Sequence, residues 1–197
     1  MAPVKIKVII GSTRPGRFSE KPASWIAGEL EKMEGVAVEV LDLRDYPMPF
    51  FEQKVQPSHG NGEYENKAVA AWATKIKDGD AFIIVSPEYN HGYPAVLKNA
   101  LDSIYQEWIR KAVGFVSYGS VGGGRVVEQL RMVAIELQLV PIRRGIHIPS
   151  AVTKAVKAVN KIDPELFKPL RVPKDMVGDF LDQLLWMARA LKTARDT

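Results

Sequence analysis

Short apolar segments alternate with longer amphipathic segments along most of the chain. The apolar segments are typical of strands buried in a parallel sheet, and they cover residues 4–10, 36–41, 81–85, 112–117 and 140–148. After them, apolar side chains recur at helical spacing in residues 20–33, 63–77, 94–103, 125–137 and 173–191. Strands that alternate with helices in this way predict a parallel sheet with helices on both faces.

This order of elements predicts an α/β fold, a doubly wound three-layer sandwich around a five-stranded parallel sheet. The strand order expected for it is 2-1-3-4-5. The chain shows no repeat, linker or low-complexity segment, so we expect residues 1–197 to form one domain. That domain includes the C-terminal part, residues 149–197, in which we expect a polar, lysine-containing arm over residues 149–172 and then the last helix.

Composition excludes several classes of protein. None of the 197 residues is cysteine, which rules out a disulfide framework, a thiolate metal site and a cysteine nucleophile. His59, His91 and His147 lie far apart in the sequence, so no metal site is expected either. The net charge of +4 is small, and no basic helix or aromatic–basic motif accompanies it, so we expect no nucleic-acid partner.

No apolar run is long enough to cross a membrane, and the first residues lack the pattern of a signal peptide. The sequence therefore predicts a soluble cytoplasmic protein. In a sheet of the predicted type, ligands bind beyond the carboxyl ends of the strands, near the point where the strand order reverses. The candidate chemistry is therefore expected in three loops, namely residues 11–19 (the first loop), 86–94 (the second loop) and 118–125 (the third loop).

The first loop leaves a buried strand and enters a helix. Glycines there allow backbone N–H groups to turn toward one point, and the helix start adds a partial positive charge. Hydroxyl and guanidinium groups are also present, which favours a phosphate site, and they come from Ser12, Thr13, Arg14, Arg17 and Ser19. The loop is neither a Walker motif nor G-x-G-x-x-G. The simpler alternative is a plain turn in which Ser19 caps the helix.

The second loop combines two prolines, a glycine, two aromatic residues and polar groups. A rigid backbone flanked by aromatic faces suits the edge of a planar heterocycle, whose acceptors could meet N–H groups near residues 88–90. His91 has no acid or hydroxyl partner that the sequence can show, and Ser86 lacks the G-x-S-x-G setting of a nucleophile. We therefore predict no catalytic side chain here.

The third loop contains three consecutive glycines, which allow a ligand to approach the backbone closely. Arg125 follows them at the start of a helix, where the helix dipole disfavours a cation. Its partner would then be a phosphate, a carboxylate or another subunit. The alternative is an ordinary surface arginine on a flexible loop.

Taken together and in this order, the three loops resemble those of the NADPH-dependent FMN reductase family, whose members have a flavodoxin-like fold. This family includes quinone, azo and chromate reductases. The resemblance covers residues 4–148, including 97–102 after the second loop and 42–49 after the second strand. In this last stretch, Tyr46 and Met48 stand where the family has leucines.

The resemblance implies an FMN site built from the three loops. The phosphate would be held by Ser12, Arg14 and Ser19, with Arg17 nearby. The isoalloxazine would be lined by backbone and side-chain groups of Pro87, Glu88, Tyr89 and Asn90. Its other side would be approached by Tyr118, Gly119 and Gly122. Residues 42–49 would lie near the flavin across a dimer interface.

The resemblance also implies a function, that of an FMN-dependent NAD(P)H oxidoreductase. Hydride would pass from NADPH, or NADH, through the flavin to free flavin, a quinone, an azo compound or a similar small acceptor. Arg17 and Arg125 are candidate contacts for the 2′-phosphate of NADPH. Apolar residues within 46–51 and 97–108 favour a homodimer or a homotetramer.

Two other functions remain open at this point. One is a flavodoxin-type electron carrier, which would not oxidise NADPH directly. Such carriers are typically acidic, whereas this chain is basic and has two arginines in its first loop, so we favour the enzyme. The other is an interaction protein that kept the fold and binds no flavin.

Overall fold

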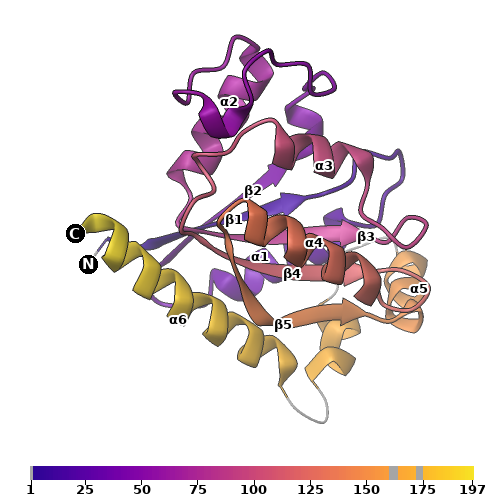
Figure 1. The fold of residues 1–197 in the computed structure, drawn as a ribbon. Helices are drawn as coiled ribbons and strands as arrows, with labels where there is room; N and C mark the ends of the chain where they lie inside the picture. Colours follow the sequence, from indigo (N-terminus) through magenta and orange to yellow (C-terminus); the bar gives the residue numbers. More distant parts are fainter. Residues whose placement is uncertain (1, 160–163, 172–174) are drawn as a thin grey trace.

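Five parallel strands form the centre of the molecule. In the computed structural model, which describes residues 2–159, 164–171 and 175–197, their order is β2-β1-β3-β4-β5. The strands are β1 (Val4–Ile10), β2 (Val36–Asp42), β3 (Ala81–Pro87), β4 (Ala112–Tyr118) and β5 (Val140–Ile148). The predicted fold class and strand order are confirmed (Figure 1).

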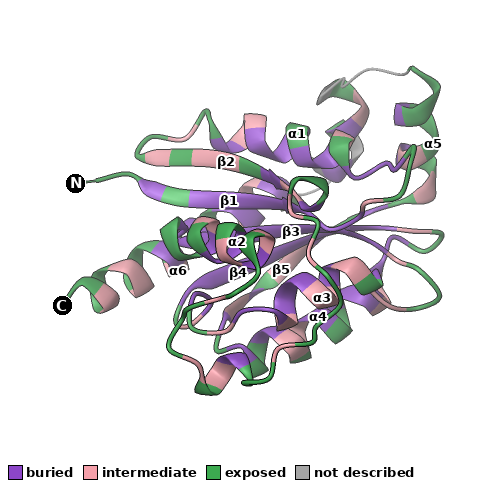
Figure 2. Ribbon diagram, turned by 90° about the horizontal axis from the view of Figure 1, so that it is seen from above, coloured by how far each residue is buried: buried purple, intermediate pink, exposed green. Residues whose placement is uncertain are grey.

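Helices cover both faces of this sheet (Figure 1). On one face lie α1 (Glu20–Leu30) and α6 (Met176–Asp196). On the other lie α2 (Lys67–Asp78), α3 (Ala95–Asp102) and α4 (Gly124–Glu136). Every residue of β3 and β4 is buried, as strands with helices on both sides require (Figure 2). Two short 3₁₀ helices, η1 (Leu43–Asp45) and η2 (Pro57–His59), follow β2.

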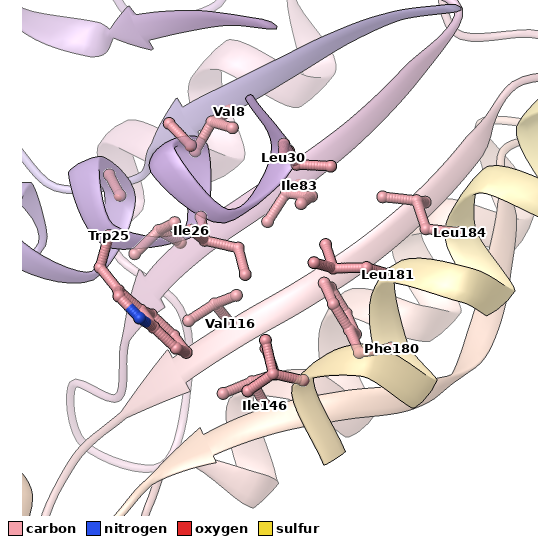
Figure 3. Packing of buried hydrophobic residues seen from close by; sticks show 14 of the residues in the cluster. Val8, Trp25, Ile26, Leu30, Ile83, Val116, Ile146, Phe180, Leu181 and Leu184 are labelled. Carbon is pink, nitrogen blue, oxygen red and sulfur yellow. The ribbon is translucent and has the colours of Figure 1, made fainter. Parts of the chain in front are cut away.

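The two faces have separate hydrophobic cores. Figure 3 shows the first of them, where Phe180 and Leu184 of α6 point toward the sheet and toward α1. A Cβ atom on Gly114 of β4 would lie 2.6 Å from Cζ of Phe180, so only glycine lets α6 approach this closely. In the second core, the ring of Trp108 contacts Trp72 and Phe82 edge-on, and Trp72 Nε1 donates to the carbonyl of residue 100.

Several element boundaries differ from those predicted. The helix predicted from residue 63 begins at Lys67, because the side chain of Asn66 accepts from two backbone N–H groups and caps α2. Strand β3 continues through Pro87, two residues into the second loop, and Pro94 precedes α3 rather than starting it. In β5, a register shift against β4 lies between Pro141 and Gly145, and the strand continues through Arg143 and Arg144.

The prediction of a polar arm over residues 149–172 is wrong where the structure describes them. Residues Ser150–Ala158 form α5, and Pro164–Arg171 form a 3₁₀ helix, η3. Val152 and Val156, one helical turn apart, are buried, and Phe167 stacks on Trp25 of α1 with ring centroids 4.4 Å apart. Residues 160–163 and 172 lie outside the described residues. The arm therefore packs against α1, the helix that the first loop enters.

Candidate functional site

The three loops meet beyond the carboxyl ends of β1, β3 and β4. The hydroxyl of Tyr89 in the second loop lies 2.9 Å from Ser12 Oγ in the first. The hydroxyl of Tyr118 lies 2.6 Å from Ser19 Oγ. The N–H of Glu88 donates to the carbonyl of Tyr118, at 2.9 Å. Each loop is thus hydrogen-bonded to the other two, and the residues expected to form one site are neighbours.

In the first loop, three consecutive backbone carbonyls accept hydrogen bonds from arginine side chains. The carbonyl of Ser12 accepts from Arg17 NH1 at 2.5 Å. The carbonyls of Thr13 and Arg14 accept from Nε and NH2 of Arg44, at 3.3 and 2.9 Å. In the part of the chain that the structure describes, several N–H groups of the loop have no protein acceptor, namely those of Thr13, Gly16, Phe18 and Ser19. Unpaired N–H groups at a helix start are suited to an anion.

Arg17 is buried beneath this loop, with a side chain only 1% exposed. Its NH1 donates to Asp42 Oδ1 at 2.7 Å and its Nε to Glu20 Oε1 at 3.0 Å. Burial alone would lower the pKa of Arg17, but hydrogen bonds to Asp42 raise it above its usual value. Every guanidinium nitrogen is therefore engaged within the protein, and Arg17 does not face a ligand that enters from solvent.

Arg14 differs from Arg17 in each of these respects. Its side chain is exposed, and no carboxylate among the described residues pairs with it. It is therefore the cation of the first loop that remains available to a phosphate. Ser12 and Ser19 are both buried, and their hydroxyls are bonded to tyrosines at the boundary between the loops.

The second loop closes in a two-residue reverse turn. Tyr89 and Gly92 exchange backbone hydrogen bonds of 2.9 and 3.0 Å, and Asn90 and His91 between them have φ of 50° and 71°. This left-handed geometry is that of a type I′ turn, in which asparagine and glycine are preferred. The imidazole Nε2 of His91 lies 2.6 Å from Arg125 NH1. His91 thus contacts the third loop through Arg125.

Arg125 has a carboxylate partner in the second loop. Its Nε donates to Glu88 Oε1 at 2.7 Å, and the Glu88 side chain is only 3% exposed. Among the described residues, Glu88 Oε2 is buried without a hydrogen-bond partner. Arg125 is thus the neutralising partner of a nearly buried carboxylate, which accounts for a cation at the start of α4.

Glycine is required in the third loop for close packing. A Cβ atom on Gly119 would lie 3.0 Å from Cβ of Glu88, and one on Gly123 would lie 2.9 Å from the backbone nitrogen of Tyr118. Gly122 and Gly123 also have φ near +80°. Burial raises the pKa of Tyr118 to about 12, so its phenol remains protonated and hydrogen-bonded to Ser19 at any physiological pH.

These residues fit an FMN molecule by their chemistry. Unpaired N–H groups, an exposed arginine and two buried hydroxyls belong to the first loop, and this combination suits a phosphate monoester. The backbones of residues 87–90 and 118–122 lie close together at the strand ends, which suits a planar ring. The fold and the site together define a flavodoxin-like flavoprotein.

Comparison with known proteins gives the family. The model of the NADPH-dependent FMN reductase family matches residues 4–153. An NAD(P)H-dependent FMN reductase of Schizosaccharomyces pombe is 39% identical over 181 residues, covering 89% of this chain and 88% of its own length. An NAD(P)H:quinone oxidoreductase of Solanum tuberosum is 32% identical over 142 residues, covering 69% and 70%.

Among solved structures, FerB, a flavoenzyme NAD(P)H:acceptor oxidoreductase of Paracoccus denitrificans, has the same fold. Its TM-score is 0.68 at 20% identity, over 93% of this chain and 98% of FerB. The chain belongs to the NADPH-dependent FMN reductase family. It is an oxidoreductase whose cofactors are FMN and NAD(P)H. None of its helices in the described ranges is long and apolar enough to cross a membrane.

Three residues of the site were not predicted from the sequence as parts of it. Asp42 and Arg44 support the first loop, and Asn99 of α3 binds the stretch after β2 through Pro49 and Phe51. Asp42 and Arg44 do lie in the segment 42–49 that resembles the family, but the sequence associated this segment with a dimer interface. Their pairing with the first loop depends on β2 lying next to β1, as the predicted strand order requires, but the sequence does not show that these two side chains contact the loop.

We predict that Asp42→Asn lowers the free energy of unfolding of the protein, by an amount that depends on pH. Burial would raise the pKa of Asp42, but hydrogen bonds from Arg17 hold it below its usual value. Its contribution to stability is therefore complete above the unfolded-state pKa, about 3.9, and is lost as pH falls through the lower folded-state value. The substitution should cost about 2 kcal/mol at neutral pH, since it leaves Arg17 buried with Glu20 alone.

The measurement is the free energy of unfolding in urea for both proteins, from neutral pH to about pH 3. The difference between them should shrink below about pH 4. Asp45→Asn, which removes an exposed carboxylate from the same 3₁₀ helix, is the matched control. A difference between wild type and Asp42→Asn that stays constant over this range would contradict the assignment.

Proposed function

We propose that the chain binds FMN with its phosphate against the first loop and its ring between the second and third loops. The observation that carries this proposal is the set of unpaired N–H groups in residues 13–19, next to backbones at the strand ends that lie side by side. Arg14, Ser12 and Ser19 complete the phosphate contacts. Pro87, Asn90 and Gly119 are among the groups at the ring.

FMN supplies the hydride chemistry when it is bound. The protein holds it, orients its exposed face and provides N–H dipoles at the ring edge, where negative charge develops on reduction. The proposal assigns no catalytic acid or base. Glu88 is committed to Arg125, and His91 contacts Arg125, so both have positioning roles.

The site is open enough for a donor and an acceptor to bind in turn. Tyr89 and Val121 are 38% and 64% exposed, one in each of the loops that face the ring. We propose that NADPH, or NADH, binds and leaves first, and that a small two-electron acceptor such as a quinone or free flavin follows at the same face.

The kinetic pattern tests this function. Initial rates measured with NADPH and a soluble quinone, in the FMN-loaded protein without any partner reductase, should give parallel reciprocal plots, since one face serves both substrates. Anaerobic NADPH should bleach the bound flavin. Bound FMN that neither NADPH nor NADH reduces would favour the electron carrier, and failure to bind FMN would favour the flavin-free alternative.

We also propose a cytoplasmic homodimer, with the stretch after β2 at its interface. Asn99 accepts from the N–H of Phe51 and donates to the carbonyl of Pro49, at 2.9 and 2.8 Å. These bonds hold Phe50 in a defined position with 81% of its surface exposed. A large aromatic side chain that is exposed on a hydrogen-bonded backbone is typical of an interface anchor. The lack of cysteine suits a reducing compartment.

Phe50→Asp should convert this dimer to a monomer, because a carboxylate at a buried anchor position has no partner there. Sedimentation velocity of the wild type and the variant measures the change. Trp186→Asp places the same charge at a side chain that is 69% exposed on α6, across the sheet from α3, and should remain dimeric. A monomeric wild type, or a dimeric Phe50→Asp variant, would refute the proposed interface.

A further inference from the structure

Two arginines, one of which the sequence placed near the FMN phosphate, bond to three consecutive carbonyls of the first loop. Arg17 donates to the carbonyl of Ser12, and Arg44 donates to those of Thr13 and Arg14. Arg17 comes from the loop itself, whereas Arg44 comes from η1, beyond β2. No other pair of side chains in the described residues bonds to three carbonyls in a row.

The peptide geometry gives these contacts a consequence on the opposite side of the loop. In a planar trans peptide, the C=O and the following N–H point in opposite directions. Because the carbonyl of Ser12 is bonded to Arg17, the N–H of Thr13 points away from Arg17 and has no acceptor among the described residues. In the same way the N–H of Arg14 points away from Arg44, and it donates to Ser12 Oγ at 3.4 Å. The third carbonyl precedes Pro15, which has no N–H. Gly16 follows with φ of +65°, a conformation that turns successive N–H groups toward a common point.

Both guanidiniums are neutralised where they lie. Arg17 is paired with Asp42, and its Nε donates to Glu20. Arg44 NH1 donates to the same Glu20 oxygen at 3.2 Å. Asp42 in turn accepts from the backbone N–H of Arg44 at 2.9 Å, so η1 is joined to this network at two points. The charge of the two arginines is thus balanced within the network and contributes little to attracting an anion from solvent.

We infer that Arg17 and Arg44 are positioning residues for the phosphate of FMN, which they do not contact. They hold the carbonyls of residues 12–14 on one side of the first loop. This leaves the N–H of Thr13 on the opposite side and fixes the path of the chain into Gly16 and the N–H groups after it, which would receive the phosphate. The inference rests on the proposed function in one respect, that the first loop binds the phosphate.

The geometry requires arginine rather than positive charge. Arg44 uses three different nitrogens for three acceptors, the carbonyls of Thr13 and Arg14 and the carboxylate of Glu20. A planar guanidinium spans such a set, whereas the compact ammonium group of lysine does not. Arg44→Lys therefore keeps the positive charge but loses the set of three hydrogen bonds. Arg44→Ala loses both the charge and the hydrogen bonds. Arg44 is partly exposed, with 39% of its side chain accessible, so both variants should fold.

The test compares the affinities of the protein for FMN and for riboflavin, which has the same ring and ribityl chain without the phosphate. Dissociation constants are measured by titration of the flavin-free full-length protein, with the quenching of flavin fluorescence as the signal. The ratio of the two constants reports the phosphate contribution alone. In both Arg44→Lys and Arg44→Ala, affinity for FMN should fall about tenfold while affinity for riboflavin is unchanged, since two hydrogen bonds that orient the loop are lost.

Arg131 provides a matched control. Its NH1 and NH2 also donate to two consecutive backbone carbonyls, those of Ile142 and Arg143 in β5, at 2.6 and 2.8 Å. Arg131→Lys changes the same kind of contact away from the first loop, and it should leave both flavin affinities as in the wild type. Thermal melting of each variant verifies that it is folded.

Each possible result of these titrations either supports or overturns the inference. A fall in the FMN-to-riboflavin preference in both Arg44 variants, with the preference kept in Arg131→Lys, supports the inference. An Arg44→Lys variant that keeps the wild-type preference shows that charge alone suffices and overturns it. Equal losses for FMN and riboflavin show a general structural role and also overturn it. A wild type with no preference for FMN over riboflavin refutes the phosphate site itself, which distinguishes failure of the proposed function from failure of this inference.

Discussion

The arrangement of the site depends on the hydrogen bonds of one buried guanidinium, that of Arg17. It lies beneath the first loop and joins this loop to Asp42 at the end of β2 and to Glu20 at the start of α1. Removing a charge of this kind from water is costly unless each of its donors finds an acceptor. The neighbouring strands β1 and β2 bring those acceptors within reach, and the shape of the loop follows from satisfying them.

The same principle governs the other two loops. Glu88, nearly buried at the end of β3, is neutralised by Arg125 from the start of α4, and the contact joins the second loop to the third. The tyrosine hydroxyls of residues 89 and 118 join both loops to the first. Most of the charged side chains near the site therefore form ion pairs within the protein and are not available to a ligand. Arg14 is the exception in the first loop, and the backbone N–H groups are the principal feature offered to a ligand.

The sequence was sufficient to predict the fold, and it predicted a site in three loops that the structure brings together. Buried strands such as β3 and β4 are continuous apolar runs, and the chemistry-bearing loops follow directly from their positions. The roles of Arg17 and Arg125 could not be predicted in this way. Both resemble phosphate-binding cations in the sequence. Asp42 and Glu88, with which they pair, lie 25 and 37 residues away, and only the tertiary structure brings them into contact.

Helix α5 was missed for a different reason. Its apolar face consists of little more than Val152 and Val156, separated by lysine and small residues, so the pattern is weak in so short a segment. The stacking of Phe167 on Trp25 depends on α1, which is far away in the sequence. These contacts stabilise a segment whose local sequence indicates little regular structure.

The most direct test of this account is a crystal structure of the protein with FMN. We expect the phosphate to accept hydrogen bonds from backbone N–H groups of residues 13–19, with Arg14 beside it and the ring between the second and third loops. Arg17 and Arg44 should still be bonded to the carbonyls of residues 12–14. A phosphate that binds the guanidinium of Arg17 or Arg44 directly, or that lies away from the first loop, would contradict the account.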